Sequence, residues 1–290
     1  KEGHRRAAFA AGGALVAALV LASASPLFGD GLRAVLRPVD AWRGALLARA
    51  VIDSAPAYLI RGAPVRLVLI VNSKPQFDMV GQADVKTVSQ LKGKVVGISS
   101  RGGAVDLLTQ LILQKHGLTP NKDVTSIVIG TPEELATALR TGRIAACLLS
   151  PPRQLILYRE GFSRLAYSGD YLPSYPSGGV GATEEKIKNN PAEVLSFVRA
   201  SLKGLQYYSQ HRSESIDIIS KYLGVKDLSL AGEVYDLHLS RIGGLGYLED
   251  AWMRGAIDFT KKSMGVSKEI PPSQVFDFSF VEKALEQIRH

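Results

Sequence analysis

From residue 85 to 172, short apolar runs alternate with segments of helical periodicity, and this alternation restricts the chain to few folds. The run "VVGI" at residues 95–98 is apolar and carries β-branched side chains, which is typical of a strand buried on both faces. In residues 104–116, apolar side chains recur every three to four positions, which predicts an amphipathic helix. Strands that alternate with helices build parallel sheets with crossover helices. We therefore predict an open α/β lobe over this region.

The other elements of this lobe have recognisable boundaries. In "TPEELATALRTG", Thr131 fits the N-cap, Pro132 the first helical position and Glu134 the third, so both a capping box and an N-terminal proline predict a helix. Gly142 is expected to end it. The runs "DVTSIVIG", "RIAACLLSPP" and "SRLAYSG" predict three more strands, with a short helix "RQLILYREG" between the last two.

The flanking segments predict a second lobe built from both sides of the first. "NNPAEVLSFVRASLKGLQYYSQH" is predicted to be a helix capped by Asn190, and further helices are expected around residues 231–242, around 250–265 and from Ser279. The runs "LRAVLRPV" and "VRLVLIVN" predict strands, and "AWRGALLARAVIDSAP" a helix leading into a strand. We expect residues 25–80 and 176–290 to form lobe 1, and residues 81–175 to form lobe 2, with "DYLPSYPSGGVGAT" as a connector.

The loop "SSRGG" at residues 99–103 is the best candidate for binding a ligand. The first N–H groups of a helix have no intrahelical partner, and glycine lets the backbone approach a ligand closely. We predict a site for a small anion, such as a carboxylate, sulfonate or phosphate, formed by Ser99, Ser100, Arg101, Gly102 and Gly103. A plain turn in which Ser100 caps the helix and Arg101 faces water is the alternative. The loop lacks both the GxGxxG pattern and a Walker lysine, which argues against a nucleotide.

Composition and charge exclude several classes of function. The net charge of +8 is dispersed, without a basic run or interleaved aromatic residues, so we expect no binding to nucleic acid. The single cysteine, Cys147, lies in the apolar run "IAACLLS", which predicts a buried thiol and not a nucleophile. Of the five histidines, His4 lies in the first 24 residues and His290 is the last residue. The other three, His116, His211 and His238, are spread along the chain and are expected at surfaces or helix ends. We therefore predict no metal, no cofactor and no catalytic residue.

The first 24 residues have the pattern of a secretory signal peptide. A basic start, "KEGHRR", precedes a 16-residue apolar stretch, and "ASAS" offers a cleavage site after Ala24. A transmembrane anchor is the alternative, but the stretch is short for a bilayer and rich in alanine and glycine. We expect an exported, periplasmic protein.

An ordered set of motifs carries a family resemblance over residues 27–285. It includes "IDSAP", "GAPVRLVLIV", "VKTVSQLKGKVVGISSRGGAVD", "ALRTGRIAACLLSPP" and "NNPAEVLSFVRASLKGL". In this order the chain resembles the exported solute-binding proteins of ABC transporters, in the branch for aliphatic sulfonates, taurine, nitrate and thiamine-pyrimidine precursors. Such proteins open with a strand and a ligand-contacting loop, whereas only "SPLFGDGL" follows the expected cleavage site here, so we expect this chain to lack or alter that part.

The resemblance implies a type II periplasmic binding protein of the α/β class, with two lobes that are each a mainly parallel sheet flanked by helices. It also implies that the strands connecting the lobes run through "NSKPQFDMVG" and "PSYPSGGVGAT". It implies a monomer that holds a small organic anion, sulfonate-like or carboxylate-like, in an interlobe cleft and delivers it to an ABC permease at the membrane. An enzyme of the same fold, similar to a pyrimidine-precursor synthase or a dehydratase, and a receptor for a sensor protein are the alternatives. The ligand-lining positions carried over from the family are Ser54, Pro56, Ser99, Ser100, Gly102, Gly103, Thr131, Ser150 and Tyr175. For the serines, helix capping is the alternative role, and for Tyr175 it is packing in the core.

Overall fold

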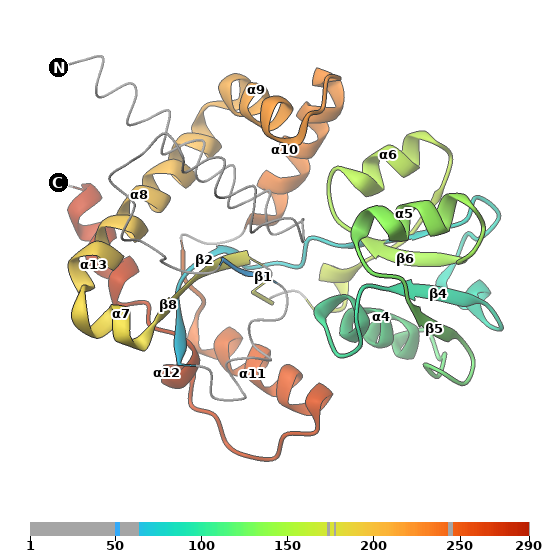
Figure 1. Ribbon diagram of the computed structural model, residues 1–290, viewed down its shortest axis with the longest axis horizontal. Coiled ribbons are helices and arrows are strands. Elements are labelled where there is room, and N and C mark those ends of the chain that lie inside the picture. Colours follow the sequence, from blue (N-terminus) through green and yellow to red (C-terminus); the bar gives the residue numbers. More distant parts are fainter. Residues whose placement is uncertain (1–49, 53–63, 173–174, 177, 243–245, 290) are drawn as a thin grey trace. The chain divides into compact units, whose positions relative to one another are not determined.

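The computed structural model describes residues 50–52, 64–172, 175–176, 178–242 and 246–289 (Figure 1). Its contacts divide the described residues into two compact units. The second unit comprises those between 74 and 175, and the first unit comprises those up to 73 and from 176 onward. The sequence placed the first boundary after residue 80. The difference arises because the strand at residues 78–81 pairs with two strands of the second unit, which takes residues 74–80 with it.

The second unit contains one five-stranded sheet. Its strands are β3 (Asp78–Gly81), β4 (Val95–Ile98), β5 (Thr125–Val128), β6 (Ala146–Leu149) and β7 (Ser163–Tyr167). Its helices are α4 (Ala104–Lys115), α5 (Pro132–Arg140) and α6 (Arg153–Arg159), with short 3-10 helices at Val88–Leu91 and Ser168–Asp170. The predicted strands and helices of this region are thus confirmed, each within a few residues.

The strand order of this sheet is β5-β4-β6-β3-β7. Strand β4 runs parallel to β5 and β6, whereas β3 runs antiparallel to β6 and β7. The sheet is therefore mixed: β4, β5, β6 and β7 run in one direction, as expected for a mainly parallel sheet, and β3 runs against them. Strand β3 is the first strand of the unit and follows no crossover helix, so the rule that makes strand–helix–strand units parallel does not apply to it.

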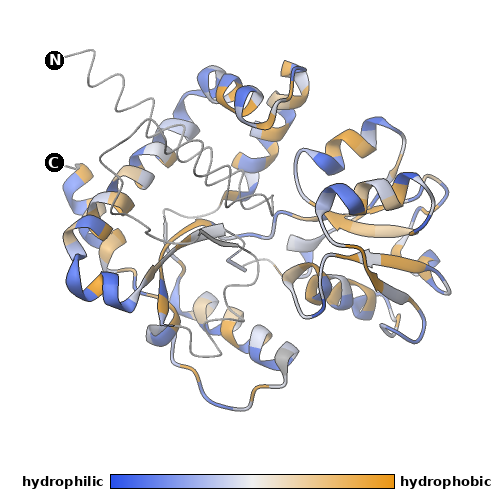
Figure 2. Cartoon of the chain, viewed as in Figure 1, coloured by the Kyte–Doolittle hydropathy of each residue, from blue (hydrophilic) through white to orange (hydrophobic). Residues whose placement is uncertain are grey.

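Helices cover both faces of this sheet. Val96 and Ile98 of β4 pack with Leu108 and Ile112 of α4 on one face. Cys147 and Leu149 of β6 pack with Leu139 of α5 on the other face. Alternate residues of a strand point to opposite faces, so a strand covered on both sides is apolar throughout. Figure 2 shows these central strands in orange, and the burial of Cys147 (1% exposed) is as predicted.

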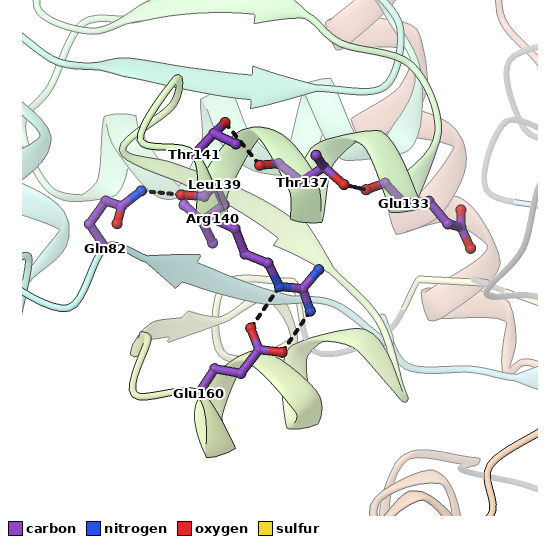
Figure 3. A network of polar contacts seen from close by, with 7 residues as sticks. All are labelled: Gln82, Glu133, Thr137, Leu139, Arg140, Thr141 and Glu160. Atoms are coloured by element: carbon purple, nitrogen blue, oxygen red, sulfur yellow. Dashed lines mark hydrogen bonds and ion pairs between the residues drawn. The ribbon is translucent and has the colours of Figure 1, made fainter.

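A polar network ties the ends of α5 and α6 together (Figure 3). Arg140 makes two parallel hydrogen bonds to Glu160, from Nε to Oε2 at 2.7 Å and from Nη2 to Oε1 at 2.9 Å. This pairing holds the pKa of Glu160 below its usual range. Gln82, which follows β3, donates from Nε2 to the carbonyl of Leu139. Such bonds hold the carboxyl end of α5 against α6 and the segment that follows β3.

The first unit contains a three-stranded sheet in the described residues. Its strands are β1 (Ala50–Ile52), β2 (Val65–Asn72) and β8 (Gly178–Thr183), in the order β1-β8-β2 with antiparallel pairing throughout. Its helices are α7 (Glu184–Asn189), α8 (Pro191–Gln210), α9 (Arg212–Leu223), α10 (Leu228–Ile242), α11 (Asp250–Met264), α12 (Pro272–Val275) and α13 (Ser279–Arg289). The sheet is sandwiched, because Leu69 and Val71 pack against α8 and α13, whereas Leu67 and Ile70 pack with residues of α11 and α12.

Strand β8, the central strand of the described sheet, lies in a segment that the family resemblance gives as a connecting strand. Its glycines permit close strand pairing, since a Cβ at Gly179 would lie 2.5 Å from the carbonyl oxygen of Leu69. Helices α7 and α9 and the short helix α12 were not predicted. In α9 only Ser215 and Ile219 are buried, so its apolar stripe is weak.

Candidate functional site: the carboxyl edge of the second unit

The predicted ligand-binding loops of the second unit meet at one edge of its sheet. Strands β4, β5 and β6 run in the same direction, with Ile98 opposite Val128 and Gly97 opposite Cys147. Their carboxyl ends therefore lie side by side. Residues 99–103 follow β4, Thr131 follows β5 after two residues, and Ser150 follows β6 directly. This carboxyl edge is where open α/β sheets bind ligands.

The loop after β4 enters α4 through glycine. Gly102 has a φ of +71°, and no atom lies within 4 Å of the place that a Cβ would take, so its backbone conformation, and not crowding, favours glycine. Gly103 is the N-cap residue, and no side chain caps the helix at that position. The alternative role of Ser100 as the helix cap is therefore wrong. Ser100 lies exposed in the loop.

Asp106 supplies the missing cap from inside the helix. Its Oδ2 accepts a hydrogen bond from the backbone N–H of Gly102 at 2.8 Å, and its Oδ1 accepts one from Nε2 of Gln110 at 2.9 Å. The residue is only 2% exposed. A carboxylate in the first turn is favoured by the positive end of the helix dipole. Sequence analysis missed Asp106, although an acidic residue at the third helical position was the signal that could have found it.

Three further N–H groups at this helix start remain open. Within the described residues, the amides of Gly103, Ala104 and Val105 have no hydrogen-bond acceptor. The first residues of a helix point their N–H groups along the axis, out of the helix. These groups can therefore donate hydrogen bonds to the oxygens of a ligand placed before the helix. The ligand would lie beside the N–H of Gly102, which already donates to Asp106.

Arg101 turns back onto its own sheet. Its Nη2 donates to the backbone carbonyl of Ser126 in β5 at 2.5 Å. A carbonyl accepts the bond without neutralising the charge, and no carboxylate pairs with Arg101 among the described residues. The guanidinium thus contributes positive potential to the loop while it is tethered at the β5 side.

Thr131 forms the predicted capping box of α5. Its Oγ1 accepts from the N–H of Glu134 at 3.3 Å and donates to Oε2 of Glu134 at 2.9 Å, while its own N–H donates to the same oxygen at 2.7 Å. These bonds, the backbone bond first, hold the pKa of Glu134 below its usual range. The helix start that follows β5 is therefore already served by a carboxylate of the chain.

Ser150 lies beside a buried amide that sequence analysis missed. Ser150 is 2% exposed, and its carbonyl accepts from the N–H of Arg153 at 3.1 Å as α6 begins. Gln154, in the first turn of α6, is fully buried, and both polar atoms of its side chain are without a hydrogen-bond partner in the described structure. No sequence pattern distinguishes such a glutamine from a surface one, because only packing decides its burial.

In the first unit, two strands end at the same row of the sheet. Ile52 at the end of β1 and Asn72 at the end of β2 both lie opposite Gly178, the first residue of β8. Strands β1 and β2 therefore end at the same edge of the sheet. Ser54 and Pro56, predicted to line the site, follow β1 and lie outside the described residues. Tyr175, the remaining predicted lining residue, belongs to the second unit and is 2% exposed.

The histidines and the cysteine show no catalytic arrangement in the described part of the chain. His116 is exposed at the end of α4, with Nε2 2.7 Å from the hydroxyl of Tyr171, and His211 lies between α8 and α9. His238 is 1% exposed, so the expectation of a surface or capping position is wrong for it; α10 packs on α9 and β2 and buries this face. Burial raises the pKa of the Cys147 thiol, which keeps it protonated.

The described residues offer neither a metal site nor a membrane span. Groups of three or more His, Cys, Asp or Glu side chains placed to hold a metal ion do not occur among them. None of the described helices is long and apolar enough to cross a membrane.

The model of the NMT1/THI5-like family matches residues 52–215 of this chain, which is more than half of its length and includes the whole carboxyl edge. The chain belongs to this family. The loops 99–103, 131 and 150 lie in the matched region.

Curated relatives of this chain are named as binding proteins. The chain is 24% identical over 193 residues to a binding protein of Brucella abortus, and the match covers 62% of this chain and 58% of the relative. It is 24% identical over 262 residues to the riboflavin-binding protein RibY of Chloroflexus aurantiacus, covering 85% of this chain and 74% of the relative. The chain thus spans less than two thirds of the length of the Brucella relative.

Solved structures show the fold to be that of periplasmic binding proteins of ABC import systems. The periplasmic sulfonate-binding protein SsuA of Methylobacillus flagellatus matches with a TM-score of 0.67 at 20% identity, covering 95% of this chain and 89% of that one. The desulfurization enzyme DSZB matches with a TM-score of 0.63 at 16% identity, covering 82% and 84%. The α/β class and the family resemblance expected from the sequence are confirmed, but the same fold also carries an enzyme.

Proposed function

We propose that this protein is the substrate-binding component of an ABC import system and that it captures a small organic anion, sulfonate-like or carboxylate-like, for a membrane permease. The observation that carries the proposal is the start of α4. There, the amides of Gly103, Ala104 and Val105 have no acceptor among the described residues, and the neighbouring Arg101 has no carboxylate partner among them. Aligned N–H groups and a nearby cation are the elements from which proteins build anion sites.

The remaining parts of the proposal rest on the sequence and the relatives. The relatives reported above are named as binding proteins, and one is a sulfonate-binding component. We infer that the chain is exported to the periplasm through residues 1–24, which lie outside the described structure, and acts as a monomer. The proposed ligand contacts are Ser54, Pro56, Ser99, Ser100, Arg101, Gly102, Gly103, Thr131, Ser150 and Tyr175.

Asp106 and Glu134 narrow the class of anion that we propose. Each places a carboxylate at a helix start of the carboxyl edge, and each accepts a backbone N–H bond there. A ligand with a large diffuse charge would be repelled by both, whereas a single sulfonate or carboxylate group can use the open amides of α4 alone. We therefore expect a compact monoanionic head group on a neutral body.

An enzyme of the same fold is the second candidate, favoured by the likeness to DSZB. Nucleophilic chemistry by the cysteine is disfavoured, because Cys147 is buried and its thiol stays protonated. A receptor that signals through a sensor protein is the third candidate, and it shares the same binding step.

Equilibrium binding tests the proposal directly. Isothermal titration and thermal shift are recorded with alkanesulfonates, taurine, nitrate, aromatic carboxylates, riboflavin and a pyrimidine. We expect one-to-one binding of a sulfonate or carboxylate, and mass spectrometry should recover the compound unchanged. Chemical conversion of the compound would show that the protein is an enzyme. Binding of uncharged compounds alone would show that the proposal of an anionic ligand is wrong. Loss of solute uptake in a strain without the gene separates import from sensing.

A further inference from the structure

A pocket of about 600 Å³ lies in the first unit, and all of its described lining residues belong to that unit. It is bounded by the loop before α11, by α11 and α12, and by the outer face of α13. Its apolar lining comprises Tyr247, Leu248, Met253, Phe276, Phe278 and Leu285. A pocket of this size and composition is of the kind that binds small organic molecules.

The polar part of the pocket is acidic. Glu282 and Glu286, one turn apart on α13, both line it. Neither carboxylate has an ion-pair or hydrogen-bond partner in the part of the chain that the structure describes. Two like charges at this spacing face the same side of a helix and destabilise it slightly. Their position is therefore not explained by the stability of α13.

Basic residues do not compensate this charge at the pocket. Among the described lining residues there is no lysine or arginine. One cation contacts the rim, since Arg66 donates to the carbonyl of Ser273, but it is ion-paired with Glu184 at 2.8 Å. The pocket thus has a local negative charge on a chain whose overall charge is +8.

Aromatic rings supply the other element. Phe276 and Phe278 lie with ring centroids 5.4 Å apart, and Tyr247 is 46% exposed, so its ring face is available to a ligand. The faces of aromatic rings carry negative charge and attract cations within about 6 Å. Rings and carboxylates together favour a ligand with a positive charge and an apolar body.

The pocket is separate from the strand ends that lead to the predicted ligand contacts. Phe276 pairs with Leu67 near the start of β2, and the N–H of Asp277 donates to the Leu67 carbonyl at 2.9 Å. Asn72, where β2 ends, is five residues further, or about 16 Å along the strand. Binding of a ligand in this pocket therefore does not depend on the anion binding proposed above.

We propose that this pocket binds a hydrophobic organic cation, meaning an ammonium group on an aromatic or alkyl body. Glu282 and Glu286 neutralise the ammonium charge, and Tyr247 contacts it through its ring. Met253, Phe276 and Leu285 contact the apolar body. An anion of the same size is repelled, which distinguishes this site from the start of α4.

Titration of the full chain with benzyltrimethylammonium tests the proposal, with benzenesulfonate as the anionic counterpart of similar size. We expect saturable binding of the cation. Any binding of benzenesulfonate should be the same in the wild type and in variants of this pocket. The variant Glu282→Gln/Glu286→Gln should weaken cation binding about fivefold, as expected for two exposed charge contacts. The matched control is Glu185→Gln/Glu214→Gln, which removes two exposed charges from α7 and α9 and should leave binding unchanged.

A second pair of variants tests the aromatic contact. Tyr247→Ala should weaken cation binding about threefold through the lost ring face. Trp252→Ala, which removes an aromatic side chain of similar exposure that does not line the pocket, should not. Failure of the cation to bind, or equal affinity in Glu282→Gln/Glu286→Gln and the wild type, would overturn the proposal. Equal losses in both double variants would overturn it as well, because the effect would then reflect overall charge.

Discussion

The carboxylate of Asp106 accepts a hydrogen bond from the backbone N–H of Gly102, across the loop in which a ligand anion is expected. The residue therefore both completes the start of α4 and places a negative charge beside the three amides that remain open. Its two effects oppose each other, since one stabilises the fold and the other weakens the attraction for an anion. This relationship gives the first prediction.

We expect Asp106→Asn to bind the ligand anion about fivefold more tightly, because about 1 kcal/mol of repulsion is removed. The amide oxygen can still accept from Gly102, so the loss of folding stability should stay near 1 kcal/mol. Calorimetric titration and urea unfolding measure the two effects. Asp123→Asn is the control, because its carboxylate caps Thr119 at the opposite, amino edge of the sheet. Tighter binding in both variants would assign the gain to net charge alone.

The proposed anion contacts predict a loss of affinity in a double variant. Ser100→Ala/Arg101→Ala should weaken ligand binding at least about tenfold, the cost of a charge-assisted contact. Both residues are exposed and the substitution removes one hydrogen bond, from Arg101 to the Ser126 carbonyl, so the protein should still fold. Ser89→Ala/Arg143→Ala makes the same chemical change at exposed positions that precede β4 and β6. Unchanged affinity in Ser100→Ala/Arg101→Ala would move the site away from this loop.

Thr131 is predicted to matter more for stability than for binding. Its hydroxyl already donates to and accepts from Glu134, so Thr131→Ala should cost about 1 kcal/mol of unfolding free energy. Ligand affinity should stay within about twofold of the wild type, because one open lone pair is the only capacity left for a ligand. Thr125→Ala, at an exposed position of β5, is the control for stability. A larger drop in affinity would show that the contact of Thr131 with the ligand is stronger than this single lone pair allows.

His238 predicts a loss of stability in mild acid. Burial, with a further contribution from Arg241, lowers its pKa to about 3 from 6.5. Between these two values the unfolded chain binds a proton at His238 that the folded chain does not. The contribution of His238 to the free energy of unfolding is therefore constant above about pH 6.5 and falls below it. The slope should approach about 1.4 kcal/mol per pH unit.

Urea unfolding at several pH values between about 7 and 4.5 measures this slope. His238→Leu should reduce it, whereas His116→Leu, at an exposed position, should leave it unchanged. Carboxylates with lowered pKa values, such as those of Glu134 and Glu160, contribute only at more acidic pH. An unchanged slope in His238→Leu would show that His238 is protonated in the folded protein.

Several elements could be predicted because their signals are local. The capping box of Thr131 and Glu134 and the proline at the first position of α5 depend on residues next to one another in the chain. The continuous apolar runs of β4 and β6 similarly require burial on both faces wherever they are placed. The burial of Cys147 follows from the same runs.

Other features depend on contacts between distant segments and could not be predicted. Strand β8 is rich in glycine and has no apolar alternation, so its own residues predict only a connector. The family resemblance implied a strand there, and its pairing with β1 and β2 on both sides is a tertiary contact. His238 was expected at a surface or helix end, yet α10 packs against α9 and β2 and buries it. Gln154 is buried for the same kind of reason.

The amino-acid sequence by itself determined the strand and helix segments of the second unit, the family and the loop at residues 99–103, because hydrophobic periodicity and capping act over a few residues. Only the tertiary structure decided the direction of β3, the bond of Arg101 to Ser126 and the acidic pocket beside α13. These depend on which distant backbones and side chains come within a few ångströms of one another. The spacing of residues along the chain does not predict such contacts, because they depend on how whole helices and strands pack.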